Sequence, residues 1–205
     1  MNVKDLAKAV KRISRKMEEN KDYLVKLDQQ NGDGDLGISM NEGFKAVEML
    51  LELTEEQDLG KVLMKSGNAF NEAAPSSLGT ILSFGFMGMA KSLKGVTDGD
   101  QLQVAAAFKA GVEKIMEKAG SKPGERTVLD SLCPAADAWE KSAKEGGSWG
   151  EALGCAARAA AEGAEATKQM LPVHGRAAYY GEKSLGHPDG GAVVGKLLFE
   201  ALGRL

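Results

Sequence analysis

The sequence lacks any long apolar run, and this absence excludes a helix that spans a membrane. Such a span needs roughly 20 consecutive apolar residues, and no segment of that length in the 205 residues is both uncharged and apolar. The first 20 residues, MNVKDLAKAVKRISRKMEEN, carry charge throughout and so lack the apolar centre of a signal peptide. We therefore expect a cytoplasmic protein without membrane association.

Aromatic residues and cysteines are also scarce. Aromatic residues make up 5% of the chain, and no stretch shows the two-residue alternation of β-branched and aromatic side chains that is typical of strands. The fold class is therefore predicted to be all-α. The two cysteines, Cys133 and Cys155, lie within apolar helical patterns, which favours buried free thiols over a disulfide.

The sequence lacks the signals that are expected of several functional classes. A net charge of −3 argues against a nucleic-acid partner, because such binding depends on clustered Lys and Arg. GEKS at 181–184 lacks the P-loop spacing from Gly175, and no dinucleotide fingerprint follows a strand. The histidines, His174 and His187, are too few for a zinc site and are interpreted as structural or surface residues. Any bound phosphate would therefore have to be held by a metal ion and by the amides at helix N-termini.

What is present is helical periodicity along almost the whole chain. Apolar residues recur every three or four positions in eight segments, at about 6–27, 38–51, 58–73, 78–93, 100–119, 126–143, 149–170 and 191–204. A chain of this length fits one domain, 1–205. We therefore predict a single bundle of eight helices.

Glycine is the one residue in clear excess. The chain has 26 glycines, well above the usual share of about 7%. Many lie between the predicted helices, in NGDGDLG (31–37), AGSKPG (119–124) and LGHPDGG (185–191). Glycine-rich backbone can turn sharply or approach a ligand closely. These three loops therefore suggest one ligand-binding end of the bundle.

The loop before the second predicted helix carries three carboxylates. Asp28, Asp33 and Asp35 are separated by glycines in LDQQNGDGDLGISM. Carboxylate oxygens in a flexible turn suit Mg²⁺, which normally also retains waters and substrate phosphates in its shell. The amides at the start of the following helix would suit a phosphate. A magnesium–nucleotide site is the hypothesis that follows.

Two other interpretations of this loop remain open. Asp33 or Asp35 could merely cap the helix, as short Asp-Gly turns often do. The spacing from Asn31 to Glu42 also approaches that of an EF-hand calcium loop, but Leu36 stands where the motif requires glycine. Outside this loop, Arg176 lies near a glycine-rich turn, where a guanidinium often binds phosphate or carboxylate and otherwise forms a surface salt bridge.

Three segments together resemble the L subunit of dihydroxyacetone kinase (DhaL), which is also the nucleotide-binding domain of ATP-dependent dihydroxyacetone kinases. LDQQNGDGDLGISM is similar to the family's L-D-x-x-I-G-D-G-D-H-G-x-N-M, and GERTVLDSL to G-D-K-T-M-x-D-x-L. GRAAYYGEKSLGHPDGGA is similar to G-R-A-S-Y-L-G-E-R-S-x-G-x-x-D-P-G-A. The resemblance spans nearly the whole chain and implies an eight-helix antiparallel barrel that binds ADP or ATP with two Mg²⁺ at one end.

The resemblance also implies roles for particular residues. Three aspartates match the metal ligands: Asp28, Asp33 and Asp35. The positions that match the nucleotide site are Leu36, Gly37, Ile38, Ser39, Ser77, Leu78, Gly79, Gly120, Thr127, Val128, Arg176, Asp189, Gly190 and Gly191. No side chain is implied as a catalytic nucleophile. Leu36 replaces the family's histidine, Ser39 an asparagine and Gly190 a proline, so phosphate and adenine contacts are expected to differ.

The implied function is phosphoryl transfer to a small hydroxy-ketone in glycerol metabolism. In the family that substrate is held by a separate K-type subunit, so this chain alone is expected to be inactive. The phosphoryl donor would be exchangeable ATP or a phosphotransferase-system protein that recharges bound ADP. A non-catalytic nucleotide-binding regulator and a Ca²⁺-binding helical module are the alternatives.

Overall fold

We describe residues 1–203 of the chain in a computed structural model. This part contains nine α-helices and three short 3₁₀-helices, and no strand. The α-helices are α1 (Val3–Glu19), α2 (Lys21–Asp28), α3 (Leu36–Leu53), α4 (Leu59–Ala73), α5 (Ser77–Ser92), α6 (Gln101–Ala119), α7 (Leu129–Lys144), α8 (Trp149–Ala166) and α9 (Gly190–Leu202). The all-α prediction is confirmed.

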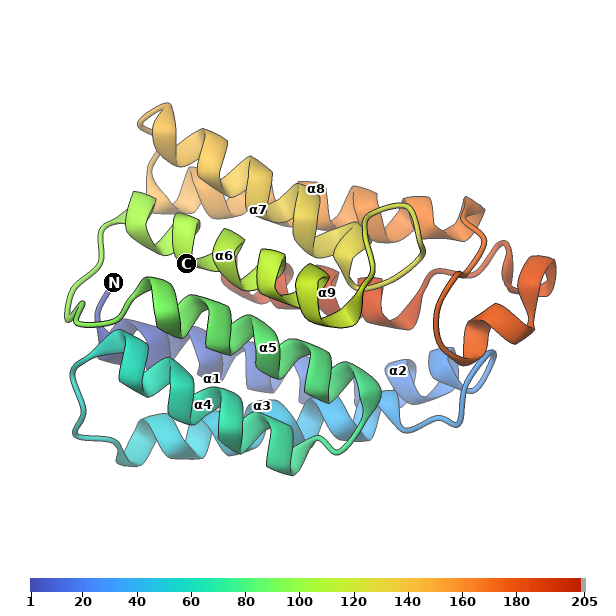
Figure 1. Ribbon diagram of the computed structural model, residues 1–205, viewed down its shortest axis with the longest axis horizontal. Helices are drawn as coiled ribbons and strands as arrows, with labels where there is room; N and C mark the ends of the chain where they lie inside the picture. Colours follow the sequence, from blue (N-terminus) through green and yellow to red (C-terminus); the bar gives the residue numbers. More distant parts are fainter. Residues whose placement is uncertain (204–205) are drawn as a thin grey trace.

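Eight of these helices close into a ring. Each of α3 to α8 packs against the next helix along the chain, α9 packs against α1, and α1 packs against α3. Neighbouring helices run in opposite directions, so the ring is an up-and-down barrel (Figure 1). The short α2 extends beyond α1 at one end of the barrel, where the loops before α3, α5, α7 and α9 also lie. The antiparallel eight-helix barrel is therefore confirmed, with α2 as an additional helix.

Local sequence signals fix where several helices begin. Asn2, Asp100 and Ser148 form capping boxes at α1, α6 and α8, in which the cap side chain and the third helical residue satisfy each other's amides. Asp58 and Ser76 accept single capping bonds at α4 and α5. These caps satisfy amides that would otherwise remain without partners at the helix starts.

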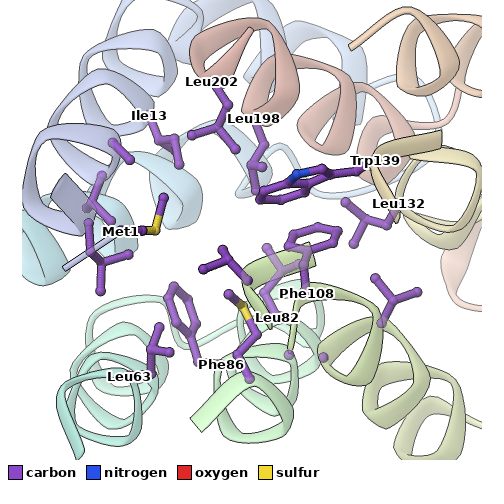
Figure 2. A pocket seen from close by; sticks show the side chains of 18 of the residues that line it. Met1, Ile13, Leu63, Leu82, Phe86, Phe108, Leu132, Trp139, Leu198 and Leu202 are labelled. Atoms are coloured by element: carbon purple, nitrogen blue, oxygen red, sulfur yellow. The ribbon is translucent and has the colours of Figure 1, made fainter. Parts of the chain in front are cut away.

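The barrel encloses an apolar cavity of about 120 Å³. Side chains from several helices point into it, among them Ile13, Leu82, Phe108, Trp139 and Leu198 (Figure 2). Cavities lined by such side chains stay dry. This interior therefore belongs to the hydrophobic core and offers no group that could bind a phosphate or a metal.

The structure differs from the predicted helix bounds in three places. The helix predicted at 126–143 begins only at Leu129. The segment predicted as one helix at 6–27 breaks at Asn20, where ψ is 7° and the cap amide bonds back to α1. The helix predicted at 149–170 ends at Ala166 and continues as a short 3₁₀-helix, Thr167–Gln169. The last helix ends at Leu202; residue 204, its predicted end, lies outside the described residues. Within residues 1–203 no helix is long and apolar enough to cross a membrane.

Candidate metal and nucleotide site

A polar cleft of about 320 Å³ lies at the end of the barrel where α2 projects. Its walls come from the 28–36 segment, the start of α5, the 126–128 loop and the 174–191 segment. The glycine-rich segments 31–37 and 185–191 both contribute to it, as predicted, whereas 119–124 does not line it. The cleft is therefore built by loops far apart in sequence that meet at one end of the barrel.

The three aspartates of the 28–35 loop converge at the mouth of this cleft. One carboxylate oxygen from each of Asp28, Asp33 and Asp35 lies within 4.8 Å of the other two. The Asp28 carboxylate also accepts a hydrogen bond from the Gly34 amide at 2.8 Å, which shapes the turn. Gly34 has φ +80°, a conformation that glycine adopts without strain. The carboxylates form a compact anionic cluster of hard oxygen ligands.

The start of α3 leaves its first amides free of side-chain capping. Asp35 occupies the cap position, but its φ and ψ are helical and its side chain accepts no capping bond. The first intrahelical bond is donated by the Ser39 amide to the Asp35 carbonyl at 2.9 Å. The structure therefore contradicts the interpretation in which Asp33 or Asp35 caps this helix. An uncapped helix start carries partial positive charge that suits an anion.

The electrostatics of the cluster favour a bound cation. Partial burial, followed by the charges of Asp33 and Asp28, raises the pKa of Asp35. The guanidinium of Arg176 forms an ion pair with Asp33, so a positive group already lies against the carboxylates. The EF-hand interpretation fails structurally as well. α3 begins at Leu36, which places Glu42 in its second turn and outside the carboxylate cluster.

The structure brings twelve of the seventeen predicted site residues to the lining of the cleft. Those twelve are Asp28, Asp33, Asp35, Leu36, Ser77, Leu78, Thr127, Val128, Arg176, Asp189, Gly190 and Gly191. The remaining five lie outside the lining: Gly37, Ile38, Ser39, Gly79 and Gly120. Their assignment to the nucleotide site stays a prediction, because none of them lines the cleft.

Two of those five residues, both glycines, have a packing role that the sequence did not reveal. A Cβ at Gly37 would lie 2.1 Å from the Lys21 carbonyl oxygen, and one at Gly79 would lie 2.0 Å from the Ala74 carbonyl oxygen. Both distances are far below van der Waals contact. In addition, the Gly79 amide donates at 3.1 Å to the Oγ of Ser76, the residue that caps α5. These glycines let backbones approach closely at the site end of the barrel.

Leu36 and Gly190, two departures from the family pattern, lie against each other. Leu36 is 6% exposed, and a Cβ at Gly190 would lie 2.6 Å from its Cδ2 atom. The leucine side chain therefore occupies space that a side chain at position 190 would need. The two departures are compatible with each other because the small residue accommodates the large one.

Ten residues that line the cleft were not predicted as site residues, among them Asn31, His174 and Arg126. Asn31 lies within the aspartate loop. His174 lines the cleft, and its Nε2 lies 2.6 Å from a Glu125 carboxylate oxygen. Arg126 also lines it, although its side chain is largely buried. Arg126 directly precedes the predicted Thr127 and Val128, so its position in GERTVLDSL was the available signal.

Asp189 caps α9 beside the cleft and is expected to weaken the fold when ionised. Its carboxylate accepts from the Ala192 amide at 2.8 Å, and burial raises its pKa to about 6 from 3.8. Because the folded-state pKa lies above the unfolded value, the stability linked to this group is lost as pH rises through 6.

Asp189→Asn should therefore stabilise the protein at pH 7.5, by about 2 kcal/mol, since asparagine also caps helices well. Urea unfolding should show this advantage shrinking by more than half at pH 4.5, where the wild-type carboxyl is largely protonated. An asparagine variant that is less stable than the wild type by the same margin at both pH values would refute the assignment.

Comparison with known proteins places the chain in a family. The model of the DAK2 domain matches residues 30–204. The chain belongs to this family. It is 28% identical to the "PEP-dependent dihydroxyacetone kinase, ADP-binding subunit DhaL" of Escherichia coli, covering 88% of this chain and 86% of the relative. It is also 33% identical to the L-erythrulose kinase of Pectobacterium atrosepticum, covering 87% of this chain but 31% of that one.

A solved structure shares the fold of this DAK2 chain. The dihydroxyacetone kinase from C. freundii, crystallised with AMP-PNP and Mg²⁺, superposes with a TM-score of 0.76 at 24% identity. The match covers 97% of this chain and 33% of the kinase. The chain thus spans most of the stand-alone DhaL subunit of E. coli but about a third of these two kinases.

Proposed function

We propose that the chain is the nucleotide-binding subunit of a dihydroxyacetone-type kinase, relaying a phosphoryl group from Mg-bound nucleotide to a hydroxy-ketone held by a separate K-type subunit. The observation that carries the proposal is the convergence of three carboxylates within 4.8 Å at the mouth of the polar cleft. Membership of the DAK2 family supports it, as does the nucleotide and Mg²⁺ in the C. freundii complex.

The residues present fit Mg²⁺. The donor set is three carboxylates, the hard oxygen ligands that this ion prefers, and Arg176 already places a cation against Asp33. Asp28, Asp33 and Asp35 would hold the metal, with two ions as the family expectation. When bound, the metal neutralises phosphate charge and orients the terminal phosphoryl group for in-line transfer.

The chain's own groups would then position the nucleotide. The uncapped amides at the start of α3 and the guanidinium of Arg176 offer positive charge to the phosphates. Ser77 and Leu78 from one side and Thr127 and Val128 from another wall the cleft. Transfer would pass directly from nucleotide to acceptor, with no covalent intermediate on the protein.

The donor we favour is a phosphotransferase-system protein that recharges bound ADP. The E. coli relative is named as PEP-dependent and ADP-binding, and the chain spans most of its length. Exchange of ATP is the other route. Dihydroxyacetone is the proposed acceptor, with four-carbon keto-sugars as the second choice because one relative is an L-erythrulose kinase.

The partner subunit would approach over the segment that borders the cleft. Leu171, Val173, Tyr179 and Tyr180 are exposed there, and Tyr179 is 91% exposed. Exposed large apolar side chains on a segment that borders a site favour that segment as a surface for protein contact. We place the K-type subunit on this surface because its substrate must reach the terminal phosphate.

Reconstitution tests the proposal. The chain alone should phosphorylate no sugar, and addition of a K-type subunit with dihydroxyacetone should start transfer from Mg-ATP, or from phosphoenolpyruvate through phosphotransferase proteins. Tyr179→Ser should slow transfer at least about tenfold without changing the affinity for Mg-ADP. Nucleotide binding without transfer to a triose or a tetrulose would instead support the non-catalytic regulator.

A further inference from the structure

The side chain of Arg126 ties together the two ends of a long loop beside the cleft. Arg126 is 4% exposed. Its guanidinium donates to the Met170 carbonyl at 3.3 Å, at the start of the loop. It also donates to the carbonyls of Ser184 at 2.6 Å and His187 at 2.9 Å, at the end of the loop, and to Ser184 Oγ. One buried cation therefore closes the base of the 170–187 loop, together with the backbone bond from the Gly186 amide to the Lys168 carbonyl at 2.8 Å.

The backbone around Arg126 is built to present this side chain. Arg126 has φ +60°, and within residues 1–203 no other non-glycine residue has a positive φ. The Asp130 carboxylate holds the turn by accepting from the amides of Gly124 at 2.5 Å and Thr127 at 2.7 Å. A strained conformation of this kind persists only where the surroundings over-determine it. The guanidinium is thus held between the two ends of the loop.

The tip of the same loop reaches the aspartate cluster. Within the described part of the chain, the Arg176–Asp33 ion pair is the one hydrogen bond or ion pair that joins residues 175–183 to a residue outside the loop. Arg176 is 63% exposed there, and an exposed ion pair alone holds a loop weakly. The placement of Arg176 therefore depends on the closed base, together with the contacts that Val173 and His174 make with Glu125.

The geometry points to Arg126 as a positioning residue for the nucleotide site, acting through Arg176. By closing the base of the 170–187 loop, it keeps Arg176 against Asp33 in the carboxylate cluster, where the nucleotide phosphates would bind. This inference rests on the proposed function. A substitution of Arg126 that opens the base should weaken nucleotide binding, because Arg176 would no longer be held in position although its own side chain is unchanged.

A double-mutant cycle tests this coupling, with Mg-ADP affinity measured by calorimetry on Arg126→Lys, Arg176→Gln and the double variant. Lysine keeps the charge but cannot bridge both ends of the loop. Each single change should weaken binding by about tenfold, and the double variant should bind within about twofold of Arg176→Gln. Losses that multiply to about a hundredfold, or an Arg126→Lys variant with unchanged affinity, would overturn the inference.

Trypsin cleavage without nucleotide gives a second readout, since Arg176 and Lys183 are cleavage sites within the loop. Arg126→Lys should accelerate cleavage at Lys183 by about tenfold, whereas Arg158→Gln, an exposed change on α8, should not. Ser184→Ala should loosen the loop less, and serves if Arg126→Lys fails to fold. Unchanged cleavage in both loop variants contradicts the inference. A wild type that binds no Mg-ADP contradicts the proposed function instead.

Discussion

Asp35→Asn is expected to weaken Mg-ADP binding by more than about a hundredfold while raising the unfolding midpoint of the metal-free protein. The carboxylate is one of three within 4.8 Å, so its loss removes a metal ligand. Its pKa is raised by partial burial and by Asp33 and Asp28, so the ionised group opposes folding when no metal is present. The affinity for Mg-ADP should therefore fall while the stability of the metal-free protein rises.

Thermal unfolding with and without Mg-ADP measures both effects of Asp35→Asn. The wild type should gain about 2.7 kcal/mol at a ligand concentration one hundred times Kd, and the variant should gain almost nothing. Asp22→Asn is the matched control, because Asp22 is exposed on α2 outside the cleft. A variant that binds Mg-ADP as tightly as the wild type would show that the cluster is not the metal site.

Gly37→Ala is expected to destabilise the protein by more than about 3 kcal/mol. A Cβ at this position would lie 2.1 Å from the Lys21 carbonyl oxygen and 2.9 Å from the Val25 amide nitrogen. Both are backbone atoms, so α2 and α3 would have to separate. Because Asp28 ends α2 and Asp35 precedes α3, the same separation would spread the metal ligands. Urea unfolding measures the loss.

Gly154→Ala is the matched control for the glycine prediction. Gly154 lies inside α8, and the nearest atom to its added Cβ would be Arg158 Nη1 at 3.8 Å, an ordinary contact. Alanine there should stabilise the protein by about 0.5–1 kcal/mol, since it restricts the unfolded chain and favours the helix. If Gly37→Ala instead folds as stably as the wild type and loses only nucleotide affinity, the role of Gly37 is phosphate binding, not packing.

The barrel was largely predictable from the sequence because its helices are amphipathic. Buried residues such as Val10, Ile13 and Met17 recur at helical spacing, and this periodicity shows which face enters the core. The break at Asn20 was not predictable, since apolar residues continue in register from Met17 to Leu24 on both sides of it. The pattern of buried residues therefore predicts which segments are helical, but it does not predict every helix boundary.

The aspartate cluster was predictable because its members are near neighbours in sequence, joined by a glycine turn. The contacts of Arg126 with Ser184, 58 residues away, could not be predicted, because a single sequence does not reveal which loops lie together in the fold. The same holds for Leu36 against Gly190 and for the close backbone approach at Gly37. These features depend on how the closed ring brings the loops together at one end.

Calorimetric titration of the wild type with ADP, with Mg²⁺ present or with the metal removed by EDTA, tests the central claim most directly. We predict a single binding event that requires Mg²⁺ and that Ca²⁺ alone does not produce. Absence of binding at millimolar Mg-ADP, or binding of Ca²⁺ without nucleotide, would contradict it.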